Sequence, residues 1–311
     1  MLDFIDKYEF NKCVKRYFGN YHVRDFDCWN QFLYLFFGQL TSLNSLQSIC
    51  LCLKAHKRKL YHLGIKKSVN TSSLSRANEK RDWRIFADFG NYLINIVRPL
   101  YTDYPITNVD IDNEIFALDS TSISCSINLL TWAQGKYSCG AVKMHTVLDL
   151  RGSIPSFIQI TDGKYHDSNV LDVMDFQSGS IYLMDKAYVD FEALLRINNA
   201  GAFFVTRAKS SIKYKIVEQN YNIDEATGLR ADKSIVLTVP KSKKLYPEKL
   251  RIVEFYDNKN DELLVFLTNN FEVSSLGVSV FDKTPMAELL TDSQFNQNVK
   301  ELQYELFPNN S

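Results

Sequence analysis

Residues 181–197, IYLMDKAYVDFEALLRI, place an aspartate directly after a short apolar run and then begin an amphipathic pattern. The run 181–184 is apolar throughout, which favours a strand that is buried on both faces of a sheet. The pattern after Asp185 repeats apolar residues at spacings of three and four and predicts a helix that Gly201 ends. A buried strand followed by a helix is typical of an α/β protein.

Further strand-like segments lie on both sides of this unit, and each is rich in β-branched and aromatic residues. The segments expected to form core strands are 114–127, 141–150, 153–161, 203–209 and 263–270. A short helix is expected over 169–176, and residues 211–262 alternate polar and apolar positions, which indicates antiparallel strands inserted into the α/β body. The expected fold is a mixed sheet with helices on its faces.

The first hundred residues have a helical period instead. Apolar spacing predicts two helices within 26–59 and a further helical region within 69–96, with Thr71, Ser72 or Ser73 as a cap. The segment 75–81, SRANEKR, is expected to be exposed, as in a helix-turn-helix unit that presents Arg and Asn to a DNA groove. Prolines at 99 and 105 mark a boundary near residue 105.

The net charge of zero hides an asymmetry along the chain. Residues 1–100 carry 16 Lys and Arg against 8 Asp and Glu, and the cations cluster between 54 and 84. Clustered cations favour a polyanion such as DNA, and the plainer interpretation is a solvated helical face. The candidate DNA-binding residues of this region are Lys57, Arg58, Lys59, Lys66, Lys67, Arg76, Asn78, Lys80, Arg81 and Arg84.

Composition excludes several classes of protein. The longest apolar stretch, 31–40, is too short to span a bilayer, and the acids of the first ten residues do not suit a signal peptide. We therefore expect a cytosolic protein without a membrane partner. The six cysteines have no zinc-ribbon or paired CxxC spacing, so we expect reduced thiols and no metal site at the CxC pair of Cys50 and Cys52.

Two aspartates end apolar runs: Asp119 follows IFAL and Asp185 follows IYLM. If the two strands are neighbours about 4.8 Å apart, their carboxylates meet at one edge of the sheet. Such acids repel one another unless a cation lies between them, which suits Mg²⁺ or Mn²⁺ and hydrolysis at phosphorus. The alternative from spacing alone is that both aspartates cap turns.

The segments 118–124 (LDSTSIS), 140–167 (GAVKMHTVLDLRGSIPSFIQITDGKYHD), 182–191 (YLMDKAYVDF) and 268–273 (TNNFEV) together resemble DDE transposases of bacterial insertion sequences, specifically the insertion-sequence-four family. The likeness covers nearly the whole chain. It implies an RNase H-like catalytic fold with inserted β-strands, preceded by an all-helical DNA-binding domain. The expected domains are 1–104 for DNA binding, 105–276 for catalysis with an insertion at about 211–262, and a tail at 277–311.

The same resemblance implies cut-and-paste DNA transposition, with Mg²⁺ or Mn²⁺ as cofactor and double-stranded DNA, both terminal inverted repeats and target, as partner. Asp119 matches the first metal-binding acid and Asp185 the second, while Lys186 departs from the Arg of the usual DRGY or DRAY. Lys143, His145, Lys164 and His166 lie in matching segments near the expected DNA path, where turn and strand-surface roles are the plainer interpretation. Whether two copies pair the ends as a homodimer stays open.

The resemblance also requires a third acid, within Tyr-x2-Arg-x3-Glu-x6-Lys on a helix after the last strand, and residues 263–311 contain no such pattern. The residues from Gly277 onward resemble the extreme tail of these proteins, which implies an internal deletion between about Leu276 and Gly277. Glu272 would lie at the start of the lost helix, too far from the metals at 1.5 Å per residue. The expected catalytic activity is therefore impaired.

Alternatives follow from this loss. The chain is either a transposase with a defective site or a non-catalytic DNA-binding protein that occupies element ends. An unrelated metal-dependent nuclease and an unstable product of a degraded gene are the remaining alternatives.

Overall fold

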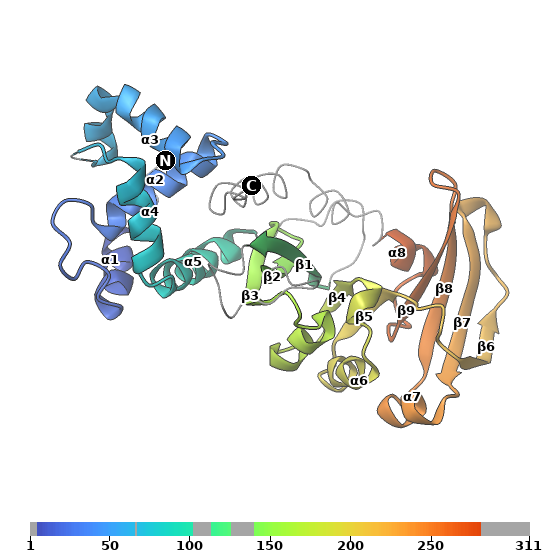
Figure 1. Cartoon of the computed structure of the whole chain (residues 1–311). Helices are drawn as coiled ribbons and strands as arrows, with labels where there is room; N and C mark the ends of the chain where they lie inside the picture. Colours follow the sequence, from blue (N-terminus) through green and yellow to red (C-terminus); the bar gives the residue numbers. More distant parts are fainter. Residues whose placement is uncertain (1–4, 66, 102–112, 126–139, 281–311) are drawn as a thin grey trace. The chain divides into compact units, whose positions relative to one another are not determined.

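The computed structural model describes residues 5–65, 67–101, 113–125 and 140–280. Contacts divide the chain into two compact units, the first ending at Leu100 and the second beginning at Tyr101. Each unit has its own hydrophobic core (Figure 1). The boundary expected near residue 105 lies outside the described residues. Within the described part of the chain, every helix is too short or too polar to cross a bilayer.

Helices make up the first unit. They are α1 (Lys7–Arg16), α2 (Cys28–Leu40), α3 (Leu46–Ala55), the 3₁₀ helix η2 (Lys57–Leu63), α4 (Thr71–Lys80) and α5 (Arg84–Val97), followed by the 3₁₀ helix η3 (Arg98–Tyr101). A side chain caps each of the first four α-helices by accepting backbone N–H groups, which such short polar residues do well. The caps are Asp6, Asp27, Ser45 and Asn70. Asn70 thus takes the role expected of Thr71, Ser72 or Ser73.

Aromatic rings hold these helices together. The ring of Phe10 on α1 lies 5.3 Å from Trp29 and 5.1 Å from Phe89 between centroids, and Phe32 lies 5.7 Å from Phe89. Burying a side chain of this size stabilises a fold by roughly 1.5–3 kcal/mol, with a further contribution from edge-to-face geometry. The apolar pattern predicted the helices after residue 26, whereas α1 buries only Phe10, Cys13 and Val14 and was not predicted.

One nine-stranded sheet forms the second unit, with spatial order β3-β2-β1-β4-β5-β9-β8-β7-β6. The strands are β1 (Ile115–Cys125), β2 (Gly140–Asp149), β3 (Ile154–Asp162), β4 (Ile181–Met184), β5 (Phe203–Arg207), β6 (Tyr214–Asn220), β7 (Leu229–Leu237), β8 (Leu250–Asp257) and β9 (Glu262–Thr268). The remaining elements are the 3₁₀ helices η5 (Asp167–Val173), η6 (Lys186–Tyr188) and η7 (Glu225–Thr227) and the helices α6 (Phe191–Asn199), α7 (Pro240–Leu245) and α8 (Ser275–Val280). The helix expected over 169–176 is the 3₁₀ helix η5.

Strand directions identify the fold. The first three strands form an antiparallel meander, and β4 and β5 then run parallel to β1. This order, 3-2-1-4-5 with the last two strands parallel to the first, is that of an RNase H-like fold, so the expected mixed sheet is confirmed. The strands β6 to β9 continue the sheet beyond β5 as an antiparallel set, which confirms the predicted insertion.

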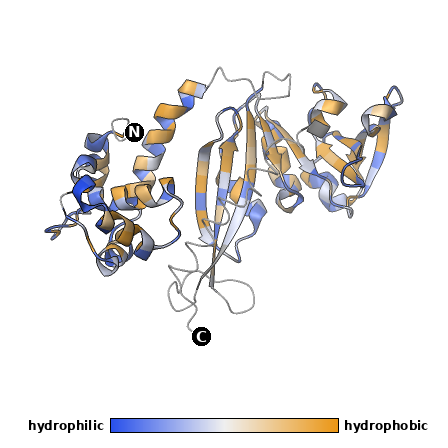
Figure 2. Ribbon diagram, turned by 90° about the horizontal axis from the view of Figure 1, so that it is seen from above, coloured by the Kyte–Doolittle hydropathy of each residue, from blue (hydrophilic) through white to orange (hydrophobic). Residues whose placement is uncertain are grey.

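The sheet has a buried residue set on each face. One set includes Leu118, Met184 and Phe204 and packs against α6, and the other includes Ile115 and Leu183 and packs against Val278 of α8. Because side chains alternate between the two faces along a strand, Leu183 and Met184, which are consecutive in β4, belong to different sets. Figure 2 shows apolar segments along the strands of the sheet. All four residues of β4 are buried, as the continuous apolar run predicts for a central parallel strand.

Candidate active site beside two parallel strands

The two aspartates lie side by side just past the last paired residues of β1 and β4, although β1 itself continues to Cys125 against β2. Leu118 of β1 is in register with Met184 of β4, and the strands are parallel. Asp119 and Asp185 each follow their member of this pair by one residue. Neighbouring strands lie about 4.8 Å apart, so the two carboxylates begin from adjacent backbone positions. The structure therefore brings together the two acids that the sequence singled out.

Alternation places both carboxylates on the same face of the sheet. Asp119 shares the parity of Ile115 on β1, and Asp185 shares that of Leu183 on β4. The backbone at Asp185 is still extended, with φ −72° and ψ 161°, so the alternation continues past the end of β4. Both acids thus lie on the face that α8 covers farther along the strands.

The electrostatic surroundings of the acids differ. Burial raises the pKa of Asp119, and the negative charges of Asp185 and Asp167 raise it further. Asp185 is exposed and its carboxylate accepts the backbone N–H of Ala187, which caps η6. Repulsion between these carboxylates favours either protonation or a bound cation.

A third aspartate, Asp167, belongs to a polar cluster close to Asp119. The Asp167 carboxylate accepts the Ser120 hydroxyl at 2.9 Å and lies 3.1 Å from the Lys143 ammonium. His145 is fully buried, with Nε2 3.1 Å from the Thr161 hydroxyl and Nδ1 3.8 Å from Asp167. Burial lowers the pKa of His145, so its ring is neutral near pH 7. The cluster joins β1, β2 and η5 directly beneath Asp119.

Sequence reasoning missed Asp167 and Ser120. Both lie within the segments that carry the family resemblance. The sequence feature that could have revealed Asp167 is its position directly after His166, in the turn that follows β3. Ser120 shares the face of Leu118, opposite to that of Asp119, so Asp167 contacts the strand from the helix-covered side. Asp167 therefore supports the strand end and does not complete a set of three ligands with Asp119 and Asp185.

Tyr188 closes this side of the site. Its ring is buried beside the strands, and burial raises the pKa of its hydroxyl well above the ordinary value, so it stays protonated. The hydroxyl forms no well-aligned hydrogen bond with a described residue, although Ser120 is close enough to lower its pKa slightly. It is the Tyr of the DKAY motif, and its ring anchors η6 to the core next to Asp185.

Glu272 lies at the opposite edge of the sheet from the two aspartates. Strand β9 runs antiparallel to β5, so it ends where β4 and β5 begin. Asn269, just before Glu272, accepts the backbone N–H of Phe204 at the start of β5. The direction of β9 in the sheet therefore explains why Glu272 is excluded as a third ligand of the metal. The junction expected between Leu276 and Gly277 falls inside α8.

The donor chemistry of the site fits a hard divalent cation. Mg²⁺ is commonly held by one or two carboxylates and completes its octahedron with waters and substrate phosphates. Asp119 and Asp185 supply two such carboxylates, and the mutual repulsion that raises the pKa of Asp119 would be relieved by a cation. The described residues hold no cluster of three or more His, Cys, Asp or Glu that could bind a metal.

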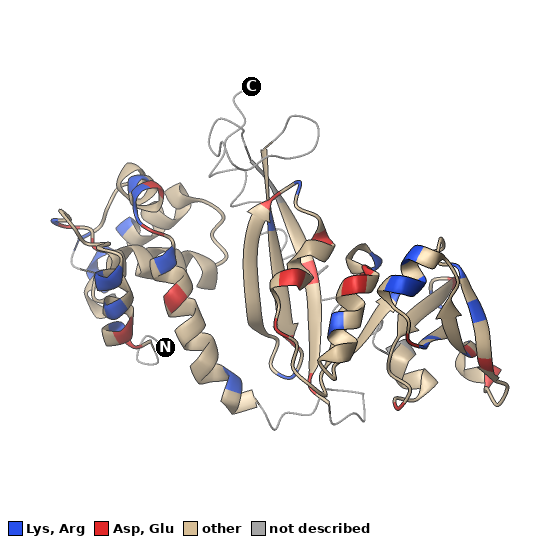
Figure 3. Ribbon diagram, turned by 90° about the horizontal axis from the view of Figure 1, so that it is seen from below, with Lys and Arg blue, Asp and Glu red and all other residues tan. Residues whose placement is uncertain are grey.

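Figure 3 marks the positions of Lys and Arg along the ribbon. Most of the candidate DNA-binding cations of the first unit are exposed. Lys57, Arg58 and Lys59 lie on η2, and Lys67 follows it. Lys66 lies outside the described residues. On α4 and α5, Arg76 donates to the Ser72 carbonyl, Lys80 is exposed, and Arg84 pairs with Asp82 at 2.6 Å. These placements suit a cationic surface that water or phosphate can reach.

Arg81 and Asn78 are instead used within the unit. The Arg81 guanidinium donates to the carbonyls of Phe26 and Asp27 and to Gln31, and Gln31 in turn donates to Asn78 at 2.6 Å. Both residues are half-buried. They tie α4 to the start of α2, so the Asn78 carbonyl oxygen and two nitrogens of the Arg81 guanidinium already have partners within the unit. Presentation of these two side chains to a DNA groove stays a prediction.

The four basic candidates of the second unit also divide into buried and exposed side chains. Lys143 is largely buried in its ion pair with Asp167, and His145 is inaccessible. Lys164 and His166 are exposed in the turn after β3, where the His166 ring accepts from the backbone of Ser168 at 3.4 Å and caps η5.

Comparison with known proteins agrees with this geometry. Residues 111–280 match the family described as "Transposase DDE domain", and residues 1–66 match a domain of unknown function, DUF4372. "Putative transposase y4zB" of Sinorhizobium fredii (strain NBRC 101917 / NGR234) is 29% identical over 168 residues, which cover 53% of this chain and 47% of that protein. The chain thus spans about half the length of this curated relative.

Among solved structures, a piggyBac transposase synaptic complex with hairpin DNA matches with a TM-score of 0.43 and 9% identity, over 97% of this chain and 72% of that one. Endonuclease V of Streptomyces avermitilis matches with a TM-score of 0.27 and 9% identity, over 66% and 93%. Both are too distant in shape to add to the argument. The match over 111–280 spans both aspartates and every strand of the sheet, and on it the chain belongs to the DDE transposase family.

Proposed function

We propose that this chain is a cytosolic transposase that binds insertion-sequence ends through residues 1–104 and cuts and joins DNA strands at Asp119 and Asp185 of the domain 105–276. The observation that carries the proposal is the register of β1 and β4, which aligns the two acids side by side. Membership of the transposase family supports it. Pairing of two ends by a homodimer belongs to the same proposal, because each end needs one DNA-binding unit.

Asp119 and Asp185 would hold Mg²⁺ or Mn²⁺, which supplies charge neutralisation at phosphorus and an activated oxygen nucleophile. The protein's own contribution is to fix the carboxylates. The Asp167 cluster holds β1 at Ser120, directly after Asp119, and the buried ring of Tyr188 holds η6 next to Asp185. The proposed chemistry is hydrolysis of one strand followed by attack of the freed 3′ hydroxyl on target DNA, with no covalent protein intermediate.

The proposed DNA contacts are the exposed cations of the first unit together with His166 in the second. They are Lys57, Arg58, Lys59, Lys66, Lys67, Arg76, Lys80 and Arg84. Lys143 would act indirectly, through Asp167, because its charge is already paired. Phosphate contacts of this kind supply affinity without sequence specificity.

We further propose that an internal block is missing between about Leu276 and Gly277, that residues 277–311 are the original tail, and that the third acid was lost with the block. A two-carboxylate site would bind metal more weakly and place the nucleophile less accurately, and small misplacements cost orders of magnitude in rate. The expected catalytic rate is therefore low.

A second candidate function is a non-catalytic protein that occupies element ends. The placement of Glu272 at the far edge of the sheet favours it, because the carboxylate that follows β9 most closely begins on the wrong side of the fold. This candidate predicts steeply salt-dependent DNA binding without strand cleavage.

Nicking of supercoiled plasmid in Mg²⁺ or Mn²⁺ separates the two functions. A transposase should nick slowly, and Asp119→Ala or Asp185→Ala should lower the rate at least tenfold, since even outer-shell changes at metal sites cost about 10–100-fold. Glu272→Gln is the matched control and should nick like the wild type. DNA binding without any nicking would favour the second candidate, and a chain that neither binds nor nicks DNA would overturn both.

A further inference from the structure

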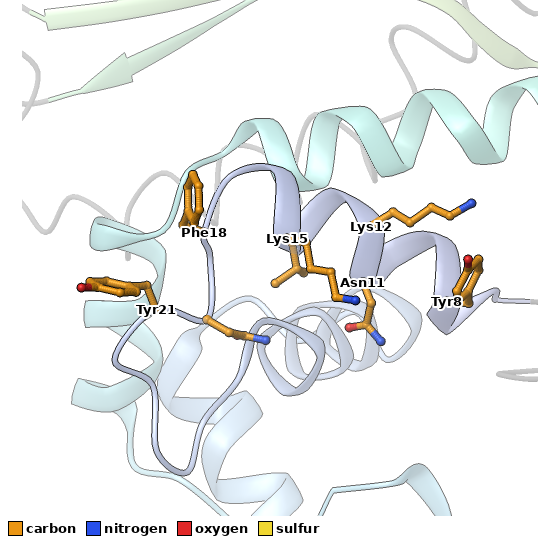
Figure 4. Close-up of a pocket in the computed structure, with 8 residues that line it drawn as sticks. Tyr8, Asn11, Lys12, Lys15, Phe18 and Tyr21 are labelled. Carbon is orange, nitrogen blue, oxygen red and sulfur yellow. The ribbon is translucent and has the colours of Figure 1, made fainter.

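A surface groove on the first unit lies outside the predicted DNA-binding set. It encloses about 620 Å³ along one side of α1 and the turn that follows, within the size range of small-ligand sites. Its lining includes Tyr8, Asn11, Lys12, Lys15, Phe18 and Tyr21 (Figure 4). The four α1 residues are spaced three and four apart, so they share one helix face, away from the buried Phe10 and Cys13.

Three aromatic rings in this groove are unusually exposed. Tyr8 is 68%, Phe18 77% and Tyr21 75% accessible. Tyr8 lies at the start of α1, and Phe18 and Tyr21 lie beyond its end, as Figure 4 shows. A single exposed aromatic is ordinary, whereas several that line one hollow mark a recognition surface.

The backbone conformation of Phe18 does not favour a bulky side chain at this position. The turn ends α1 with a Schellman motif, in which the N–H of Gly19 donates to the Val14 carbonyl and the N–H of Phe18 donates to the Lys15 carbonyl. Phe18 takes the left-handed position of that motif, with φ 53°, where glycine is the usual residue. The chain thus keeps a bulky ring where neither backbone preference nor burial favours it.

Gly19 holds the turn in place. A Cβ at this position would meet the Ile85 Cδ1 atom at 2.4 Å and the Cys28 sulfur at 2.8 Å, so the turn packs directly on the core. Asn20 reinforces it by accepting the backbone N–H of Cys28 at 2.8 Å. The rings of Phe18 and Tyr21 are therefore displayed from a rigid turn, which lowers the entropy cost of binding.

The charge of the groove points to an anion. Its lining contains two lysines and no carboxylate. The Lys12 ammonium pairs with Glu9 at 2.7 Å and lies 4.6 Å from the Tyr8 ring centroid, so it orders Tyr8. Within the described part of the chain, the Lys15 ammonium forms no ion pair, which leaves it available to a phosphate.

We propose that this groove binds an unpaired nucleotide of DNA, with its base stacked on Phe18 or Tyr21 and its phosphate at Lys15. Stacking on aromatic side chains accepts any base, because every base has a π-face, and it requires a base that is free of the duplex stack. The inference rests on the proposed function, since it supplies a second DNA contact on the unit proposed to bind element ends.

The test measures binding of a labelled oligothymidylate and of a mixed-sequence duplex to the full-length chain by fluorescence anisotropy. At least one of Phe18→Gly and Tyr21→Ala should weaken oligothymidylate binding roughly tenfold or more, the change expected when one base stack is removed, and both should leave duplex binding within about twofold. Lys15→Gln should reduce the salt dependence of oligothymidylate binding by about 0.7 in log–log slope.

Two controls separate the groove from folding and from general aromatic contact. Phe18→Gly places glycine at the left-handed position, so its melting temperature should equal or exceed that of the wild type. Tyr221→Ala removes a ring that is likewise 83% exposed but belongs to the second unit, and it should bind both DNAs like the wild type.

Unchanged oligothymidylate binding in Phe18→Gly and Tyr21→Ala would overturn the inference, as would an equal loss of duplex binding. A groove variant that changes the sedimentation mass instead would assign the surface to a second copy of the chain and also overturn it. A wild type that binds duplex but not oligothymidylate removes the groove proposal alone, whereas a wild type that binds neither removes the proposed function with it.

Discussion

At the scale of single residues, Asp119 and Asp185 differ in a way that suits a metal site. Asp119 is half-buried, and burial together with two neighbouring carboxylates raises its pKa, whereas Asp185 is exposed. Their negative charges therefore repel each other when no cation is bound. A cation that binds between them binds the folded state and not the unfolded chain, so it stabilises the fold.

Thermal unfolding in the presence of Mn²⁺ measures this effect without any catalysis. At a Mn²⁺ concentration one hundred times its dissociation constant, linkage contributes about 2.7 kcal/mol and should raise the unfolding temperature of the second unit by several degrees. Asp119→Asn and Asp185→Asn should abolish the shift, and Asp119→Asn alone should raise the metal-free stability near pH 7 because it removes a disfavoured charge.

Glu272→Gln is the control for this measurement and should retain the full Mn²⁺ shift, because Glu272 follows β9 at the opposite edge of the sheet. A shift that disappears in Glu272→Gln as completely as in Asp119→Asn would refute the two-carboxylate site and return Glu272 to the metal.

At the scale of elements, a buried ion pair joins the inserted strands to α8. Arg251 of β8 lies 2.8 Å from Asp232 of β7, and both side chains are at least nine-tenths buried. The same guanidinium donates to the carbonyls of Asn270 and Val273 and to the Ser275 hydroxyl. Arg251 therefore fixes the chain between the end of β9 and the first turn of α8.

Arg251→Ala should destabilise the second unit by about 3–5 kcal/mol, because it leaves the Asp232 carboxylate buried without its partner. Urea unfolding followed by far-ultraviolet circular dichroism measures the change in the free energy of unfolding. Arg230→Ala, which removes an exposed arginine of β7 that lies over the Tyr256 ring, should cost less than about 1 kcal/mol.

The same destabilisation should depend on pH. Burial would raise the pKa of Asp232, but hydrogen bonds from Arg251 and Ser275 outweigh it and hold the pKa below its ordinary value. The stability contributed by this charge is therefore present above the ordinary Asp value of about 3.9 and is lost as pH falls through the lower folded-state value. An Arg251→Ala difference that stays constant as the pH falls through and below that lower value would contradict the ion pair's role.

At the scale of the whole molecule, the chain has two units with separate cores and unequal charge. The cations of the first unit lie mainly between residues 54 and 84, while the remaining 211 residues carry 20 Lys and Arg against 28 Asp and Glu. A chain of zero net charge can therefore bind DNA strongly through one unit, because phosphate contacts act over about one Debye length.

Changing Lys57, Arg58 and Lys59 together to Gln should lower the log–log salt slope of duplex binding by about 0.9 for each phosphate that is no longer neutralised, up to roughly 2.7. Titrations at several salt concentrations measure it. The control changes three exposed lysines of α7, Lys241, Lys243 and Lys244, which alters net charge equally in the second unit. Equal slopes for the two triple variants would show that net charge, not the η2 surface, governs binding.

Local patterns alone were enough to predict much of this protein. The apolar run of β4, the β-branched and aromatic residues of β2 and β3, and the helical period after residue 26 are local signals, and that information is contained in consecutive residues. The pairing of Asp119 with Asp185 was also within reach, because both end apolar runs and the family resemblance supplied the order of the strands. The short amphipathic helix α1 buries only three residues, too few for its apolar pattern to predict a helix.

Other features depended on contacts between residues distant in sequence. Only the folded chain shows that Asp167 accepts a hydrogen bond from Ser120, 47 positions away, and that Arg81 donates to Phe26 and Gln31. It also shows that β9 ends at the side of the sheet opposite the two aspartates, so Glu272 begins there. Strand direction and side-chain partners are set by packing of the whole sheet and core, and such non-local terms leave no period in the sequence. The sequence by itself thus determined which two acids directly follow the apolar runs of β1 and β4, and the tertiary structure decided which neighbours can reach them.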